Sequence, residues 1–312
     1  MSNIDDVIIK AKIILGGSEF GVEWDEGSLG EGLTGGKGEG LSEIVGAVKE
    51  SMPSSLKLKC APSRKGPEYE KTCYNLDELK IIAKKLGINI SGSKEQIKEK
   101  IMETGKFIDE MDMIYTLGDV KRLEVFRPYG PNHKFNWLSN FNIDEFLDQY
   151  RKIFPKFYNF RSTYVNFYEF ETPEMTPQNI KALYDKGYRT FAIIVNTARY
   201  GEEGKHWISL MIKLDPNYTQ EILFYDSIGD APPGDLNDII NDTIKAFPQL
   251  KLKLTSCGLR AQYGGSLCGV YAIHFIIYIL YNMDEKFADY CKDRRSDNLM
   301  EFFRDNIFFT MK

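Results

Sequence analysis

The sequence predicts an α+β protein in which a small helical module precedes a larger mixed domain. Beyond residue 137, four short runs have the composition of β-strands, and apolar helical segments precede and follow them. Upstream, residues 74–103 carry helix signals alone. Helices on both sides of a sheet of roughly four or five strands are typical of an α+β fold. The 312 residues are enough for one large and one small domain.

The composition excludes several classes of protein. With 43% hydrophobic residues the chain is not disordered as a whole, and its formal net charge of −5 excludes a polycation that coats nucleic acid. The longest apolar run, residues 270–281, is too short to span a membrane, and the N-terminus lacks the basic region of a signal peptide. We therefore expect a soluble intracellular protein with no membrane partner.

The cysteines and histidines argue against disulfides and metals. Five irregularly spaced cysteines are too few for a disulfide scaffold, which favours a reducing compartment where thiols stay free. No Cys-x-x-Cys pair occurs, and the three histidines do not fall at zinc-ligand spacing. We expect no metal and no other cofactor.

Four regions follow one another along the chain. Residues 1–54 are predicted to be flexible, because the stretch 16–46 holds 11 of the 26 glycines. Residues 74–103 form the helical module. Residues 104–135, which contain two prolines and a glycine at 128–131, are predicted to be a linker. Residues 136–312 form the larger domain.

The helical module can be read closely. Asn75 and Glu78 have the spacing of a capping box, and so do Ser93 and Gln96. Gly87 stands where the first helix would end in a left-handed residue. Apolar residues follow helical periodicity through both segments: Leu76, Leu79, Ile82, Ala83, Leu86, Ile97 and Ile101.

This helix–loop–helix resembles the SAP motif of chromatin-associated proteins. The matching segments are Leu76-x-x-Leu79, Leu86-Gly87-Ile88 and Ser91-Gly92-Ser93-Lys94. The resemblance implies DNA binding that involves Lys94 and the amides at the start of the second helix. Residues 55–106 agree in charge, with 12 Lys and Arg against 7 Asp and Glu. The alternative is a helical hairpin that docks a protein such as a core protein.

The larger domain begins with a helix predicted over 141–154, in which Asn142 and Glu145 have capping spacing. The predicted strands are Thr190–Asn196, Trp207–Leu214, Glu221–Tyr225 and Lys251–Thr255, and an apolar helix follows from Cys268 to about Leu280.

His206 is the candidate general base. It lies at the start of a predicted strand, whereas His133 falls in a Pro/Gly-rich connection and His274 inside the apolar helix. Asp226 follows the next strand, and pairing of the two strands would bring its carboxylate to the imidazole, where it fixes the tautomer.

Cys268 is the candidate nucleophile. It opens the apolar helix, whose N-terminus lowers the pKa of a thiol and offers amides to an oxyanion. Gln262, six residues upstream, can add a side-chain N–H donor. Cys60, Cys73, Cys257 and Cys291 lack this context.

The order His206-Trp207, Asp226, Gln262 and Cys268-Gly269 resembles the SUMO and ubiquitin-like-protein-specific cysteine protease clan. Trp137-Leu138-Ser139-Asn140 resembles the segment that opens the clan's catalytic domain. The segment Ser139–Glu145, Gly204-Lys205-His206-Trp207, and Ser227-x-Gly229 with Pro232-Pro233-Gly234 look most like the polyprotein proteases of large DNA viruses, those of the African swine fever virus type. Leu267 departs from the clan, which usually has an acidic residue before the cysteine.

The resemblance implies the papain-related fold shared by adenovirus and SUMO proteases. It assigns Cys268 as nucleophile, His206 as base, Asp226 as its orienter and Gln262 as oxyanion donor. Trp137 and Trp207 would stack around a narrow tunnel for substrate.

The implied substrate is a protein with Gly-Gly-type sites, and the expected activity is maturation of viral capsid or core polyproteins, in the virion and the host cytoplasm. The alternatives are a deconjugase of SUMO- or ubiquitin-like modifiers and a non-catalytic DNA- or scaffold-binding protein.

Overall fold

The computed structural model describes residues 58–118, 121–133, 136–292 and 295–309. The glycine-rich region 1–54 therefore lies outside the described residues. The chain divides into two compact units, residues 1–128 and residues 129–312. Among the described residues, none of the helices is both long enough and apolar enough to cross a bilayer.

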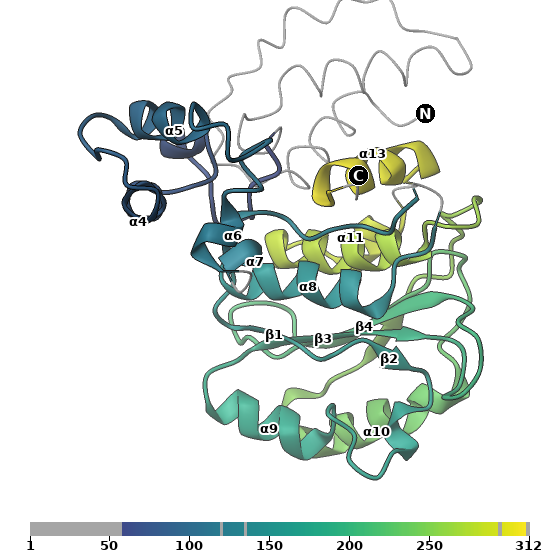
Figure 1. Cartoon of the computed structure of the whole chain (residues 1–312). Coiled ribbons are helices and arrows are strands. Elements are labelled where there is room, and N and C mark those ends of the chain that lie inside the picture. Colours follow the sequence, from purple (N-terminus) through teal and green to yellow (C-terminus); the bar gives the residue numbers. More distant parts are fainter. Residues whose placement is uncertain (1–57, 119–120, 134–135, 293–294, 310–312) are drawn as a thin grey trace, which may run out of the picture. The chain divides into compact units, whose positions relative to one another are not determined.

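The N-terminal unit contains the two helices that the capping pattern predicts, α4 (Leu76–Lys85) and α5 (Lys94–Met102) (Figure 1). Asn75 and Ser93 both form complete capping boxes, with Glu78 and Gln96 as partners. Gly87 ends α4 with φ +72°, as its position predicts. The described part of the unit also contains three shorter elements: η1 (Pro67–Tyr69), α6 (Ile114–Leu117) and α7 (Arg122–Val125).

Polar contacts and a disulfide hold this unit together. Arg64, 9% exposed, binds both carboxylate oxygens of Glu78 at 3.1 and 2.7 Å. Cys60 and Cys73 form a disulfide, and Cys60 also forms a β-bridge to Phe126. The segment expected as a linker, 104–135, contributes buried residues such as Ile114 and Phe126 to the unit.

The C-terminal unit is built on a six-stranded mixed sheet in the order β1-β3-β4-β5-β6, with β2 also paired to β3. The strands β3, β4 and β5 are antiparallel neighbours, while β1, β2 and β6 pair in parallel. The strands are β1 (Phe157–Asn159), β2 (Thr163–Tyr164), β3 (Thr190–Asn196), β4 (Trp207–Lys213), β5 (Glu221–Tyr225) and β6 (Leu254–Ser256).

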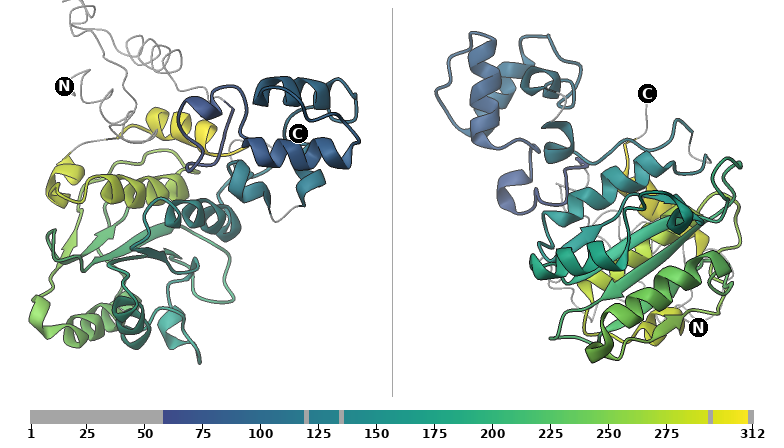
Figure 2. Two further views of the ribbon diagram at one scale, coloured as in Figure 1. Left: turned by 90° about the vertical axis from the view of Figure 1, so that its left-hand side faces the viewer. Right: turned by 90° about the horizontal axis from the view of Figure 1, so that it is seen from below.

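Helices cover both faces of this sheet. On one face lie α8 (Asn140–Arg151) and α11 (Cys268–Tyr281), and on the other lie α9 (Pro177–Asp185) and α10 (Asn237–Ala246) (Figure 1). Figure 2 shows the same layers from two further directions. Every residue of β3 and β4 is buried, as expected for strands covered on both sides. The other elements of this unit in the described residues are η3 (Phe167–Glu169), η4 (Gly234–Leu236), η5 (Pro248–Leu250), α12 (Phe287–Lys292) and α13 (Asp297–Ile307).

The central helix α11 fixes where the candidate nucleophile lies. Residues 268–280 of this helix are all buried, so its apolar sequence reflects burial on every side. The hydroxyl of Ser209 on β4 donates to the carbonyl of Ala272 at 3.2 Å. The helix therefore packs along β4 and brings Cys268 to the sheet end at which β4 begins.

The helix predicted over 141–154 spans Asn140–Arg151, so it begins one residue earlier and ends three residues earlier than predicted. Its N-cap is Ser139, whose hydroxyl accepts the N–H of Asn142, so Asn142 is the reciprocal partner within α8 and not the cap. The predicted strand 251–255 is also shifted, to Leu254–Ser256.

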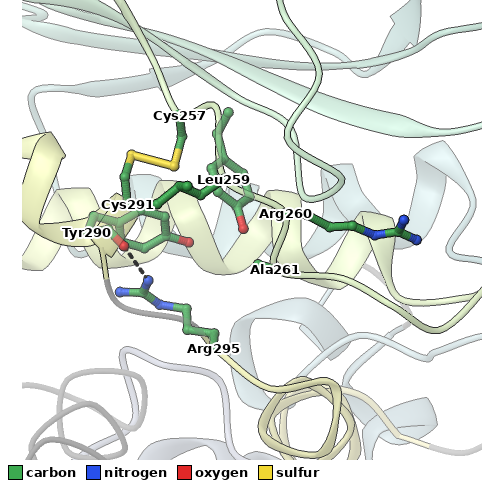
Figure 3. Close-up of a pocket in the computed structure, with 8 residues that line it drawn as sticks. Cys257, Leu259, Arg260, Ala261, Tyr290, Cys291 and Arg295 are labelled. Atoms are coloured by element: carbon green, nitrogen blue, oxygen red, sulfur yellow. Dashed lines mark hydrogen bonds between the residues drawn. A yellow bond between two sulfur atoms is a disulfide. The ribbon is translucent and has the colours of Figure 1, made fainter. Parts of the chain in front are cut away.

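The expectation that the four other cysteines are free thiols is wrong. Cys257 and Cys291 form a second disulfide, with Cα atoms 5.5 Å apart (Figure 3). All five cysteines lie in the described residues, and Cys268 alone among them is a free thiol. The spacing hides these pairs because 13 and 34 residues separate the partners and only the fold brings them together.

Candidate active site

His206 and Asp226 meet because β4 and β5 are antiparallel neighbours. His206 immediately precedes β4 and Asp226 immediately follows β5, so both lie at the same end of the sheet. The imidazole Nε2 lies 2.7 Å from Asp226 Oδ1. The same carboxylate oxygen accepts the N–H of Ile228 at 2.9 Å, which fixes the carboxylate. The pairing proposed from the sequence is therefore present.

The end of β3 holds the backbone of His206. The carbonyl of His206 accepts the N–H of Thr197 at 2.7 Å. The buried side chain of Asn196 accepts the N–H groups of Ala198 and Lys205 at 3.0 and 2.9 Å. The glycine turn before His206 is thereby tied to the neighbouring strand.

Cys268 is the first residue of α11, and its thiol is one of the groups that raise the pKa of His206. The helix begins without a side-chain cap, whereas α4, α5, α8, α9 and α13 each have one. The backbone N–H groups in the first turn, beside Cys268, are therefore not bound by a capping side chain.

The pKa of His206 is raised from 6.5 to about 9. Burial alone would lower this pKa, but the hydrogen bonds to Asp226 and Cys268 and the negative charges of both groups raise it. The imidazole is therefore mostly protonated at neutral pH. A cation beside the sulfur favours the thiolate form.

Gln262 lies on a segment that folds back onto the turn after β5. The N–H groups of Ala261 and Gln262 both donate to the carbonyl of Ser227 at 2.8 Å. The amide of Gln262, 4% exposed, accepts the Ser227 hydroxyl at 2.7 Å and donates to the carbonyl of Gly264. The structure thus brings Gln262 beside the Asp226 turn.

Asp297, the first residue of α13, anchors the same segment from another direction. Its carboxylate accepts the N–H groups of Tyr263 and Gly264 at 3.0 and 2.7 Å. It also accepts the hydroxyl of Tyr271 at 2.9 Å. Since Tyr271 lies one turn after Cys268 on α11, this network connects the segment of Gln262 to the helix of the candidate nucleophile.

Trp207 and Trp137 are connected through Leu138. The indole N–H of the buried Trp207 donates to the carbonyl of Leu138 at 2.9 Å. Trp137 is 43% exposed on the same segment. The expected stacking of the two indoles is absent from the described residues. A Cβ on Gly269 would lie 3.2 Å from Leu138 and from Trp207, so this packing favours glycine after Cys268.

The other residues considered from the sequence lie outside this cluster. His274 is 1% exposed within α11, and burial holds its pKa well below the ordinary value, as fits a structural residue. His133 is exposed, as predicted. In the N-terminal unit, the amine of Lys94 donates to the carbonyl of Glu68 and lies 4.7 Å from the ring centre of Tyr69. These internal contacts give no support to DNA binding by Lys94.

Three residues of the site have no role in the sequence reasoning: Ser227 as a hydrogen-bond partner, Leu138 as a backbone acceptor and Asp297. Ser227 had a signal, because it follows Asp226 directly. Asp297 is 29 residues after Cys268 and had none. No group of three or more His, Cys, Asp or Glu side chains in the described ranges could hold a metal ion.

A model of the Ulp1 protease family, C-terminal catalytic domain, matches residues 143–312, which is more than half of the chain. The chain belongs to the Ulp1 protease family. It is accordingly a thiol protease. The matched residues lie within the C-terminal unit, which contains every member of the cluster described above.

Viral proteins are among the relatives of this Ulp1-family chain. A protein of Acanthamoeba polyphaga mimivirus, a thiol protease by its name, is 26% identical over 261 residues, 71% of this chain and 84% of that protein. A protein of African swine fever virus, a SUMO-1 cysteine protease by its name, is 27% identical over 205 residues, 60% of this chain and 74% of that protein.

A solved structure extends the likeness in fold. A crystal structure of the African swine fever virus protease matches with a TM-score of 0.59 at 22% identity, over 81% of this chain and 96% of that chain. Residues 129–312 are less than two thirds of the chain, so the match includes residues of the N-terminal unit. The SAP resemblance of that unit stays a prediction.

Proposed function

We propose that this Ulp1-family protease is an endopeptidase that cleaves after Gly-Gly-type sites through a thioester acyl-enzyme. The observation that carries the proposal is His206, whose Nε2 lies 2.7 Å from Asp226 and whose pKa, although burial lowers it, is raised to about 9 by Asp226 and Cys268. An imidazolium held in this way stabilises a thiolate at neutral pH.

In the first half of the proposed reaction, the Cys268 thiolate attacks the carbonyl carbon of the scissile peptide, and a C–S bond forms as the carbonyl oxygen becomes an oxyanion. The amide of Gln262 and the first-turn amides of α11 stabilise that charge. Collapse of the intermediate breaks the C–N bond, and the His206 imidazolium gives its proton to the departing amine.

In the second half, neutral His206 takes a proton from water as the water attacks the thioester. The C–S bond breaks, the product leaves as a carboxylic acid that releases its proton to solvent, and the thiolate–imidazolium pair is restored. Asp226 keeps its charge throughout and stabilises the imidazolium in both halves.

The preference for glycine is supported by the crowding around Cys268. Leu138 and Trp207 pack against Gly269, and the exposed Trp137 stands on the same segment. A substrate residue bound beside this packing has more room for a bare backbone than for a side chain. We infer that the substrates carry glycine immediately before the cut.

Similarity to the African swine fever virus and mimivirus proteins supports a viral structural precursor as the substrate. The name of the African swine fever virus protein, a SUMO-1 cysteine protease, favours a modifier deconjugase as the second candidate. Incubation with a SUMO fusion and with a capsid precursor that contains internal Gly-Gly sites separates the two.

The test of the chemistry is covalent capture. A peptide electrophile ending in Gly-Gly is expected to label Cys268 in the wild type, whereas the His206→Ala variant should react at least about 100-fold more slowly. A matched probe ending in Ala-Ala controls for the glycine preference. Absence of labelling at Cys268, or equal labelling in the variant, would overturn the proposal and favour a non-catalytic scaffold.

A further inference from the structure

The turn after β5 contacts two members of the candidate site with two successive side chains. Asp226 binds His206, and Ser227 binds Gln262. Ser227 is 1% exposed and Gln262 is 4% exposed, so their hydrogen bond is shielded from water. The contact between Asp226 and His206 stabilises the imidazolium in the proposed mechanism, and the contact between Ser227 and Gln262 has no role in it so far.

The backbone of this turn is docked tightly on the segment of Gln262. The carbonyl of Ser227 accepts two N–H groups, from Ala261 and Gln262. Gly229 has φ +85°, and a Cβ there would lie 2.8 Å from the backbone nitrogen of Arg260. Only glycine allows this approach without a shift of the backbone. The Ser227 hydroxyl is therefore held in a fixed place relative to Gln262.

The Ser227 hydroxyl distinguishes the two ends of the Gln262 amide. It donates to Oε1 at 2.7 Å, while the carbonyl of Gly264, which can only accept, takes one N–H of Nε2. A flipped amide would direct its oxygen at the Gly264 carbonyl, which is repulsive. An amide nitrogen has two N–H groups, so in the observed orientation the second remains for an oxyanion.

We propose that Ser227 is the positioning residue of Gln262, and that its hydroxyl orients the amide so that Nε2 is the end presented to the oxyanion. This inference rests on the proposed function. In the turn after β5, Asp226 then orients the base His206, and the next residue, Ser227, orients the oxyanion donor Gln262.

A double-mutant cycle tests the inference. Ser227→Ala is expected to lower kcat on a Gly-Gly peptide about tenfold, the size of a lost neutral hydrogen bond, with KM changed by less than about twofold. Gln262→Ala is expected to lower kcat about 100-fold or more. The double variant should equal Gln262→Ala within about twofold, because the hydroxyl has no amide left to orient.

Ser162→Ala is the matched control. Ser162 is also buried and its hydroxyl also donates one hydrogen bond, to the carboxylate of Asp144 at 2.7 Å. Loss of this hydroxyl should lower the free energy of unfolding to a similar extent, whereas kcat and KM should stay at the wild-type values. Ser227→Gly is the second variant for Ser227, and the same loss in kcat is expected.

Alkylation of Cys268 by iodoacetamide separates the inference from the proposed function, because this displacement forms no oxyanion. Its rate should be unchanged in Ser227→Ala. Wild-type kcat in that variant, or a tenfold loss that persists in the Gln262→Ala background, would overturn the role of Ser227 alone. So would failure of both Ser227 variants to fold. A wild-type Cys268 without enhanced reactivity would instead overturn the proposed function.

Discussion

Asp226→Asn should move the alkaline limb of the pH–rate profile. In the wild type the thiolate–imidazolium pair is lost when His206 deprotonates, so kcat/KM should fall as pH rises through about 9. Asparagine keeps an oxygen that can face Nε2 at a similar distance but removes the negative charge. The alkaline limb is therefore expected at a lower pH.

The magnitude follows from the contacts of His206. Its pKa rises from 6.5 to about 9 although burial opposes the rise, and each pH unit corresponds to about 1.4 kcal/mol. A neighbouring carboxylate typically accounts for about 1–3 pH units. We expect the limb to move down by about 1–2 pH units, which is about 1.4–2.7 kcal/mol of lost imidazolium stabilisation.

Two measurements check this result. One is kcat/KM for a Gly-Gly peptide from about pH 5 to about pH 10, and the other is the rate of Cys268 alkylation over the same range. Ring-proton NMR in a His133→Gln background adds a direct titration, because His274 is buried with a lowered pKa and stays neutral. Asp230→Asn is the control, since it removes the same charge from an exposed position four residues away.

The free energy of unfolding should also depend on the protonation of His206. A pKa raised in the folded state contributes stability that is complete below pH 6.5 and is lost as pH rises through about 9. The stability difference between wild type and Asp226→Asn should therefore shrink at high pH. An alkaline limb that stays near pH 9 in Asp226→Asn would refute the reasoning.

Three further predictions concern the surroundings of the site and the N-terminal unit. Gly269→Ala places a Cβ 3.2 Å from Leu138 and Trp207, so thermal unfolding should show a loss of about 1–3 kcal/mol; an unchanged midpoint would contradict this packing. Asp297→Ala removes the acceptor of two backbone N–H groups, and urea unfolding should show a loss of about 1–2 kcal/mol with lower kcat, whereas a change in KM alone would speak against a role in holding the segment. The double variant Cys60→Ser/Cys73→Ser, which lacks the disulfide of the N-terminal unit, should lose about 3 kcal/mol of stability, and a urea midpoint equal to that of the wild type would disprove it.

Local sequence signals determined the helices and strands that depend on residues close together in the sequence. The two capping boxes of α4 and α5 are present because each needs only residues three positions apart. The strands Thr190–Asn196 and Glu221–Tyr225 have the predicted bounds, since apolar runs between turns give a strong signal. At the start of α8, both Ser139 and Asn142 are suitable N-cap residues, and the tertiary structure makes Ser139 the cap.

The candidate site was predictable in its residue types and in the pairing of His206 with Asp226, because adjacent antiparallel strands bring their ends together. Contacts between segments far apart in the sequence were not predictable. The carboxylate of Asp297, the hydroxyl of Ser227 and the two disulfides depend on how α13 and the loops close on the sheet.

The sequence by itself therefore determined the family resemblance, the α+β class and the order of the chemical groups. The tertiary structure alone decided which groups hold them in place, because a hydrogen bond or disulfide between segments 13 to 35 residues apart leaves no periodic trace in either segment.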